Sequence, residues 1–358
     1  MVGRGFTRRF DNVSDQLYLQ LYITYPNYFY IPKAFVFKKF VLQYPLFIQE
    51  VESKMYKSIL KDNRFKVFFA VFVMVGWAMA YPLIKLGYQE FQIDGADLGG
   101  KIMFAGIRFF LAGTAVTIFS RLRKIDAEIS DRGTLGWLFL LGLVNTALHY
   151  MFAYVGLGFN SSARSTILDS MGGFLLIILS TAIFADDRMT WKKALGCVLG
   201  IAAIVSININ PGEDFFADIT MRGDGMILLN ACCTAFGGLI TRVISRKMNI
   251  TRATGYSMQI GGGLLIAAGL LAGPRRPWTI TAKGIFILFC LIMISAVCFG
   301  IYNALLSVHP ISEIAIYNAL IPVLGVIFAA LLLHEELRPQ YIIAVIMVAL
   351  GIHVANQK

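Results

Sequence analysis

Long apolar runs separated by short charged segments dominate this 358-residue sequence from residue 66 to its end. Each run approaches the roughly 20 residues that a helix needs to cross a hydrocarbon core of about 30 Å. Because lipid offers the backbone no hydrogen bonds, only helices or closed barrels cross it, and continuous apolar runs indicate helices. The predicted fold class is an all-α integral membrane protein. We expect ten transmembrane helices, at residues 66–87, 101–120, 135–157, 161–184, 192–209, 224–243, 254–272, 283–305, 312–333 and 340–356.

The composition supports this class. Hydrophobic residues make up 57% of the chain and charged residues 15%, whereas a soluble domain carries about 25% charged residues. The net charge of +11 would also suit a nucleic-acid-binding protein, but the basic residues lie mostly in short loops between apolar runs. Cytoplasmic loops of membrane proteins carry this excess of Lys and Arg. We therefore expect the lipid bilayer as a partner and no nucleic acid.

Two segments of the chain, 184–206 and 332–354, share one pattern. Each has an apolar stretch, a short acidic turn with an Arg, and a second apolar stretch that ends in small residues. Internal duplication of this kind is typical of secondary transporters. Each half holds five spans, and because five is odd, the second half must enter the membrane upside down relative to the first. The sequence predicts two inverted five-helix repeats, at residues 55–209 and 224–358, joined by an extracytoplasmic linker at 210–223.

The loop charges predict the orientation. With the amino end in the cytoplasm, the inner segments hold more than twice as many Lys and Arg residues as the outer segments. This bias predicts a multi-pass protein of the cell (inner or plasma) membrane with both termini cytoplasmic. Residues 1–54 lie outside the pattern, because they contain neither a spanning run nor a signal-peptide cleavage pattern. We expect the functional fold to begin near Met55; the alternative is an amphipathic extension that lies on the membrane surface.

Three polar side chains are expected at one depth in the membrane. With a rise of 1.5 Å per residue, Arg108, His149 and Asp169 lie about 11, 9 and 12 Å from the outer face. Charged residues at such depth cost roughly 2.5–3.5 kcal/mol on insertion scales and usually mark functional sites. We expect a solute site in which Arg108 binds an anionic group, Asp169 supplies the counter-charge and His149 exchanges protons. The alternative is a permanent Arg108–Asp169 ion pair beside a structural His149.

Further candidate residues lie on the same helices. Trp77, Tyr81 and Lys85 share one face of the first span, and Asn145 shares a face with His149. Aromatic stripes are more often helix packing than ligand sites, and Lys85 lies near the outer boundary, where its stem can snorkel. The second half has no acid or base at comparable depth and offers polar lining residues instead: Asn230, Thr234, Tyr317 and Asn318.

Motifs in three spans resemble those of the EamA-type members of the drug/metabolite transporter superfamily. Gly76–Lys85 is similar to the family's opening with Trp, Gly and Lys, although here the Gly precedes the Trp. Arg108 with the following Phe resembles its Arg-Phe signature in the second span. Asn318–Pro322 resembles its Ser-Pro span, whereas the first half has Gly172 and Gly173 where that Pro would fall.

The ends of the two halves complete the resemblance, which covers roughly residues 66–356. Asp186–Thr190 and Glu335–Pro339 are similar to the family's Gly-Glu-x-Leu turn, although both lack the Gly. The order and spacing of the motifs carry the resemblance rather than any single motif. It implies a solute carrier with an inverted five-plus-five helix fold. It leaves the solute open among amino acids, sugars, nucleotide derivatives and drugs.

The predicted function is a secondary transporter of a small organic solute, such as an amino acid, metabolite or drug-like compound, by alternating access. No ATP-binding motif occurs, so a solute or proton gradient would supply the energy, with His149 and Asp169 as proton carriers. The sequence His334-Glu335-Glu336 is followed by Arg338 rather than the His of a zinc motif, and we expect no metal, no cofactor and no catalytic residue. The alternative from another class is an intramembrane enzyme that uses His149 and Asp169 on a lipidic substrate.

The assembly state stays open between a monomer and a homodimer. Gly196-x-x-x-Gly200 and Gly269-x-x-x-Gly273 allow close helix contact, either inside the protein or between copies. The duplicated halves disfavour a channel.

Overall fold

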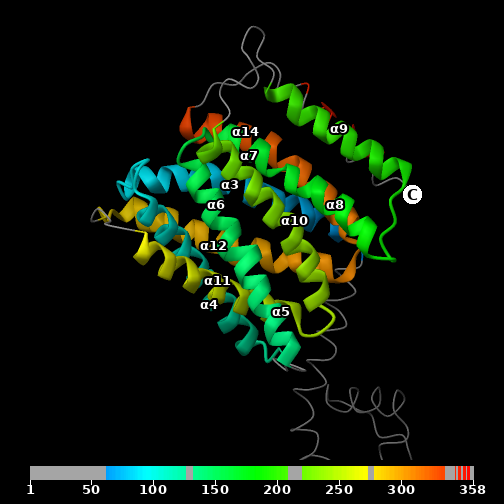
Figure 1. The fold of residues 1–358 in the computed structure, drawn as a ribbon, viewed down its shortest axis with the longest axis horizontal. Coiled ribbons are helices and arrows are strands. Elements are labelled where there is room, and N and C mark those ends of the chain that lie inside the picture. Colours follow the sequence, from blue (N-terminus) through cyan, green and yellow to red (C-terminus); the bar gives the residue numbers. More distant parts are fainter. Residues whose placement is uncertain are drawn as a thin grey trace, which may run out of the picture. The chain divides into compact units, whose positions relative to one another are not determined.

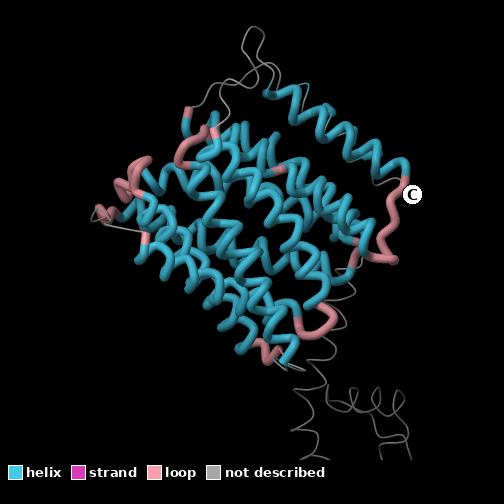
Figure 2. The backbone as a smooth tube through the Cα atoms, viewed as in Figure 1, coloured by secondary structure: helices cyan, strands magenta, loops and turns pink. Residues whose placement is uncertain are grey.

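The computed structural model describes residues 62–125, 132–208, 220–272 and 278–334, and the helical residues 343, 346–347, 350–351 and 353–354. The expected extension 1–54, the linker up to residue 219 and most of the tenth span lie outside the described residues. All regular structure in the described ranges is helical (Figure 2).

The helices follow the expected spans in order (Figure 1). In the first half these are α3 (Asn63–Glu90), α4 (Leu98–Leu122), a third span of α5 (Arg132–Gly142), π-helical η2 (Leu143–Leu148) and α6 (His149–Leu157), a fourth of α7 (Ser162–Asp169) and α8 (Met171–Ile183), and α9 (Trp191–Asn208). The second half has η3 (Met221–Gly225) with α10 (Met226–Ile244), α11 (Ile250–Leu271), α12 (Ala282–Val308), and α13 (Ile311–Ala315), 3₁₀-helical η4 (Ile316–Ala319) and α14 (Leu320–Leu333).

Within the part of the chain that the structure describes, seven of the expected spans are helices long and apolar enough to cross a membrane. The fifth and seventh expected spans are the helices α9 and α11, and the few described residues of the tenth are helical. The expectation of an all-α membrane protein is therefore confirmed. The seven spans are Asn63–Glu90, Leu98–Leu122, Arg132–Leu157, Arg164–Ile183, Met221–Ile244, Ala282–Val308 and Ile311–Leu333.

The helices α4 and α11 contact each other backbone to backbone. A Cβ atom built on Gly113 would lie 2.7 Å from the carbonyl oxygen of Gly255, and one on Gly106 would lie 3.1 Å from that of Gly262. The start of one helix meets the end of the other, so the two run antiparallel. Small residues allow such close approach in lipid. The glycines recur every seven residues, as Gly99, Gly106 and Gly113 on α4 and Gly255, Gly262 and Gly269 on α11.

Two adjacent glycines of α11 give a matched test of this contact. A Cβ atom on Gly262 would overlap the backbone of Phe110, whereas one on Gly263 would meet nothing within 4 Å. We predict that Gly262→Ala lowers the free energy of unfolding by about 1–3 kcal/mol, because the backbones must separate. Gly263→Ala should leave it unchanged or raise it, because alanine favours the helix. Thermal unfolding of both purified variants in detergent checks this, and equal effects would contradict the contact.

Two aspartates in the turn after α8 connect this turn to neighbouring helices at one end of the protein. Asp187 is 2% exposed and accepts hydrogen bonds from the Ser312 amide (2.8 Å), the Ser312 hydroxyl and Lys193 Nζ (2.9 Å). Asp186 forms an ion pair of 2.8 Å with Arg242 of α10. Burial of Asp187 opposes its ionisation, but the hydrogen bonds from Ser312 and Lys193 outweigh burial and hold its pKa below the usual value. The turn thus joins α8, α9 and α13 through one carboxylate.

This network predicts a pH dependence of stability. A carboxyl whose pKa is lowered by folding stabilises the protein fully above its unfolded pKa of about 3.9, and the contribution is lost as the pH falls through the folded-state pKa. At pH 6, Asp187→Asn should therefore lower the free energy of unfolding by about 1–3 kcal/mol. Its melting temperature should also fall less steeply toward pH 3 than that of the wild type. Asp186→Asn is the control with the smaller effect, because that side chain is 49% exposed.

Candidate central cavity

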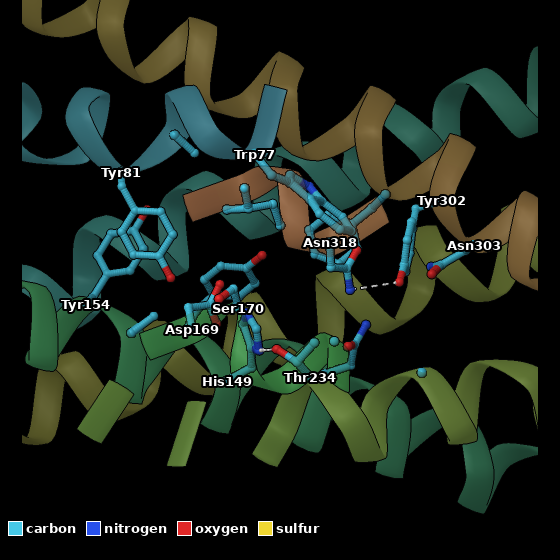
Figure 3. A pocket seen from close by; sticks show the side chains of 18 of the residues that line it. Trp77, Tyr81, His149, Tyr154, Asp169, Ser170, Thr234, Tyr302, Asn303 and Asn318 are labelled. Atoms are coloured by element: carbon cyan, nitrogen blue, oxygen red, sulfur yellow. Dashed lines mark hydrogen bonds between the residues drawn. The ribbon is translucent and has the colours of Figure 1, made fainter. Parts of the chain in front are cut away.

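A cavity lies between the two halves of the protein (Figure 3). Its volume is about 80 Å³, counted as the space open to the centres of water molecules. Side chains of α3, α4, the third span and the α7–α8 junction line it from the first half, and side chains of α10, α12 and the η4–α14 segment line it from the second. Of the expected site residues, the structure places Trp77, Tyr81, Arg108, Asn145, His149, Asp169 and Asn318 in its wall.

Arg108 is 1% exposed and is held by neutral groups from two other spans. Its Nε donates to Ser295 Oγ (2.8 Å) and to the Leu291 carbonyl (3.1 Å), and its Nη1 donates to the Tyr154 hydroxyl (2.9 Å). The guanidinium also lies 4.8 Å from the centre of the Phe109 ring. It forms no ion pair with any described residue, so the alternative of a permanent pair with the expected carboxylate is not seen. The structure leaves a buried positive charge at the cavity.

Asp169 lies where α7 ends, at the junction with α8. It accepts a hydrogen bond from Asn230 Nδ2 of α10, and the Tyr81 hydroxyl points toward it (Figure 3). His149 follows the π-helical turns of η2, and its Nδ1 lies 3.3 Å from Thr234 Oγ1. The cavity therefore carries one negative group and one imidazole, each held by a polar residue of α10.

Interruptions in the helices bring polar residues to the cavity. The fourth span breaks between Asp169 and Met171, and the ninth span turns into the 3₁₀ helix η4, which carries Asn318. A Cβ atom on Gly173 would lie 2.7 Å from the Cβ of Asn318. The absence of a side chain at Gly173, where the family that the motifs resemble has a proline, therefore allows α8 to pass close to η4.

Two polar atoms in the cavity wall have no hydrogen-bond partner among the described residues. They are the indole Nε1 of Trp77, a donor, and the side-chain oxygen Oδ1 of Asn318, an acceptor. The amide nitrogen of Asn318 is already bonded to the Tyr302 hydroxyl at 3.2 Å. Buried polar groups in proteins are almost always hydrogen-bonded. Both atoms belong to residues of the cavity wall, which therefore keep one donor and one acceptor unused among the described residues.

Three of the expected residues lie outside the cavity wall, among them Asn230, which bonds Asp169 instead. Several lining residues were not expected. Tyr317 is 5% exposed and packs in the apolar core instead of the cavity wall. Lys85 lines a separate cavity near the end of α3. Tyr302 is one unexpected lining residue, and Ser295, which bonds Arg108, lies seven residues before it on α12, a spacing that places both on one helix face. The remaining unexpected lining residues include Tyr150, Tyr154, Ser170, Thr241, Phe299 and Asn303.

Comparison with known proteins identifies relatives over the same region. The chain is 23% identical to an uncharacterized transporter of Archaeoglobus fulgidus over 290 residues, covering 80% of this chain and 95% of the relative. It is also 23% identical to a probable amino-acid metabolite efflux pump of Escherichia coli over 299 residues, covering 80% and 92%. A solved crystal structure shares the fold with a TM-score of 0.62 at 13% identity, covering 80% of this chain and 96% of that chain.

The family comparison covers most of the protein. The model of the EamA-like transporter family matches residues 64–209 and 221–357, which contain every lining residue discussed above. The match confirms the resemblance that the sequence motifs indicate. This chain belongs to the EamA-like transporter family and is a multi-pass membrane transporter.

Proposed function

We propose that this protein is a secondary transporter that moves a small zwitterionic, amino-acid-like solute through the central cavity by alternating access. The observation that carries the proposal is that Arg108 and Asp169 line one cavity without pairing with each other. A zwitterion brings one negative and one positive group to such a wall, so each buried charge gains a partner. The relatives named as probable amino-acid metabolite efflux pumps favour this solute class.

Helix packing supports an inverted repeat. In the first half, α3 packs against α12 and α14; in the second half its counterpart α10 packs against α6 and α8. These are equivalent pairs, because α6 and α12 belong to the third span of each half and α8 and α14 to the fourth. The equivalent helices α4 and α11 run antiparallel, as inversion requires. The same relation favours a solute path at the interface of the halves.

Two ion pairs between the halves also occupy equivalent positions. Lys66, the fourth residue of α3, pairs with Glu313, the third residue of α13, at 2.9 Å. Asp224, the fourth residue of η3, pairs with Arg164, the third residue of α7, at 2.7 Å. The charges are exchanged between the two pairs. In the expected topology the pairs lie at opposite membrane faces, which is where two gates of alternating access belong.

The intramembrane enzyme is the weaker candidate. A general base needs a third group that orients it, but Asp169 accepts its hydrogen bond from Asn230 rather than from His149. The two relatives described above are named as a transporter and as an efflux pump. We keep His149 and Asp169 as proposed proton carriers for coupled transport.

A transport assay with matched arginine variants tests the proposal. Purified protein in proteoliposomes should exchange a labelled zwitterionic amino acid from a panel that also contains amines, carboxylates and sugars. Arg108→Met should reduce this exchange on the order of 10- to 100-fold, because it removes hydrogen bonds to a charged group. Asp169→Asn should reduce it similarly.

Arg252→Met is the control, because Arg252 is 7% exposed and bonds the Ile125 carbonyl but does not line the cavity. It should keep the wild-type exchange rate per folded protein. Unchanged exchange by Arg108→Met, or exchange of sugars alone, would contradict a zwitterion site.

A further inference from the structure

The central cavity has two chemically different ends. Figure 3 shows Tyr154 and Asp169 at one of them, here called the charged end, to which Arg108 also belongs because it donates to the Tyr154 hydroxyl. The other end, here called the amide end, is formed by Trp77, Tyr302, Asn303 and Asn318 (Figure 3). These four side chains are uncharged. The proposed function places the charged groups of the solute at the charged end and leaves the amide end without a role.

Contacts hold the residues of the amide end close together. The ring centres of Trp77 and Tyr302 lie 4.7 Å apart, and Nδ2 of Asn318 donates to the Tyr302 hydroxyl at 3.2 Å. Asn303 follows Tyr302 on α12, and its Nδ2 donates to Thr254 Oγ1 of α11 at 2.8 Å. Both amide nitrogens are therefore bonded within the protein, which fixes the orientation of the two amides.

Four polar groups of the amide end have hydrogen-bonding capacity that no described residue uses. Trp77 Nε1 lacks an acceptor and Asn318 Oδ1 lacks a donor within the described part of the chain. The Tyr302 hydroxyl accepts from Asn318 but donates to no described residue, and no described donor bonds Oδ1 of Asn303. Buried polar groups are almost always hydrogen-bonded. The amide end thus offers two donors and two acceptors, all of them neutral.

A carboxamide matches this set of groups. Its nitrogen carries two donors and its oxygen accepts two hydrogen bonds, which equals the acceptors and donors of the amide end. A carboxylate has acceptors alone and an ammonium has donors alone, and each would bring a buried charge to a neutral wall, which is costly. A hydroxyl has one donor and would leave one acceptor unpaired. An apolar side chain would leave all four groups unpaired.

The distance between the two ends suits a free amino acid. Ser295, which bonds Arg108, and Tyr302 are seven residues apart on α12, which is about 10 Å along the helix. An amino acid with a short side chain and a hydrogen bond of about 3 Å at each end spans this distance. We infer that the amide end is a side-chain subsite, which binds the carboxamide of an asparagine- or glutamine-like solute. The inference rests on the proposed function, because it assigns the side chain of the proposed zwitterion.

Thermal stabilisation of the full-length protein in nanodiscs tests the subsite by binding alone. Asparagine, aspartate and leucine share one branched shape and one zwitterionic backbone, but they differ in the polar groups of the side chain. Asparagine should stabilise the wild type with an apparent affinity on the order of 10- to 100-fold higher than leucine or aspartate, because a site built for hydrogen bonds rejects analogues that cannot form them. Glutamine against methionine extends the comparison to a longer side chain.

Two substitutions locate the preference at the amide end. Trp77→Phe removes the indole donor and keeps an aromatic ring beside Tyr302, and Asn318→Leu removes the acceptor and keeps the branched shape. Each should lower the preference for the carboxamide about 5- to 10-fold. Gln259→Met is the control, because it removes an amide that bonds Thr114 and does not line the cavity. It should keep the wild-type preference.

The outcomes distinguish this inference from the proposed function. If leucine and methionine stabilise the wild type as well as asparagine and glutamine do, a zwitterion site stands but the carboxamide subsite is wrong. If both substituted proteins keep the full preference, the carboxamide binds elsewhere and the inference is also overturned. If no amino acid stabilises the protein, the proposed function fails and the inference fails with it.

Discussion

The backbone contact between α4 and α11 is the constraint on which the central cavity depends. Glycines spaced by seven residues on both helices hold α4 against α11 from Gly99 to Gly113 of α4. Arg108 follows one of these glycines, Gly106, by two positions, so the contact also fixes the position of Arg108 relative to α11. Lipid offers that charge no partner, and the protein supplies Ser295 and Tyr154 from two further spans. The position of one buried cation thus connects the scaffold to the cavity.

The polar wall of the cavity follows from broken helices. A continuous helix in lipid satisfies its own backbone, and irregular backbone is tolerated only inside protein or beside a cavity. The junction at Asp169 and the 3₁₀ turn at Asn318 belong to the fourth span of each half, so the same device occurs twice. Each break brings a polar side chain to the interface of the halves. The break in the first half carries charge, and the one in the second half carries an amide.

The spans were accessible from the sequence, because hydropathy marks them. Arg108, His149 and Asp169 were expected at one level and do line one cavity. The rotation of each helix about its axis was not accessible. That is why Asn318 faces the cavity while its neighbour Tyr317 packs in the core. The partners of Arg108 were also missed, since a serine and a tyrosine in apolar spans give only a weak spacing signal.

The central claim is that the two equivalent ion pairs act as the gates of alternating access. Labelling of a cavity residue from each membrane face tests this claim most directly. In a background without the five native cysteines, one variant carries cysteines at Lys66 and Glu313 and a second carries them at Arg164 and Asp224. After each pair is joined by a short bifunctional thiol reagent, a cysteine at Thr234 reports access to an impermeant reagent from either membrane face. The account predicts access from opposite faces in the two cross-linked variants. Access from the same face in both would contradict it.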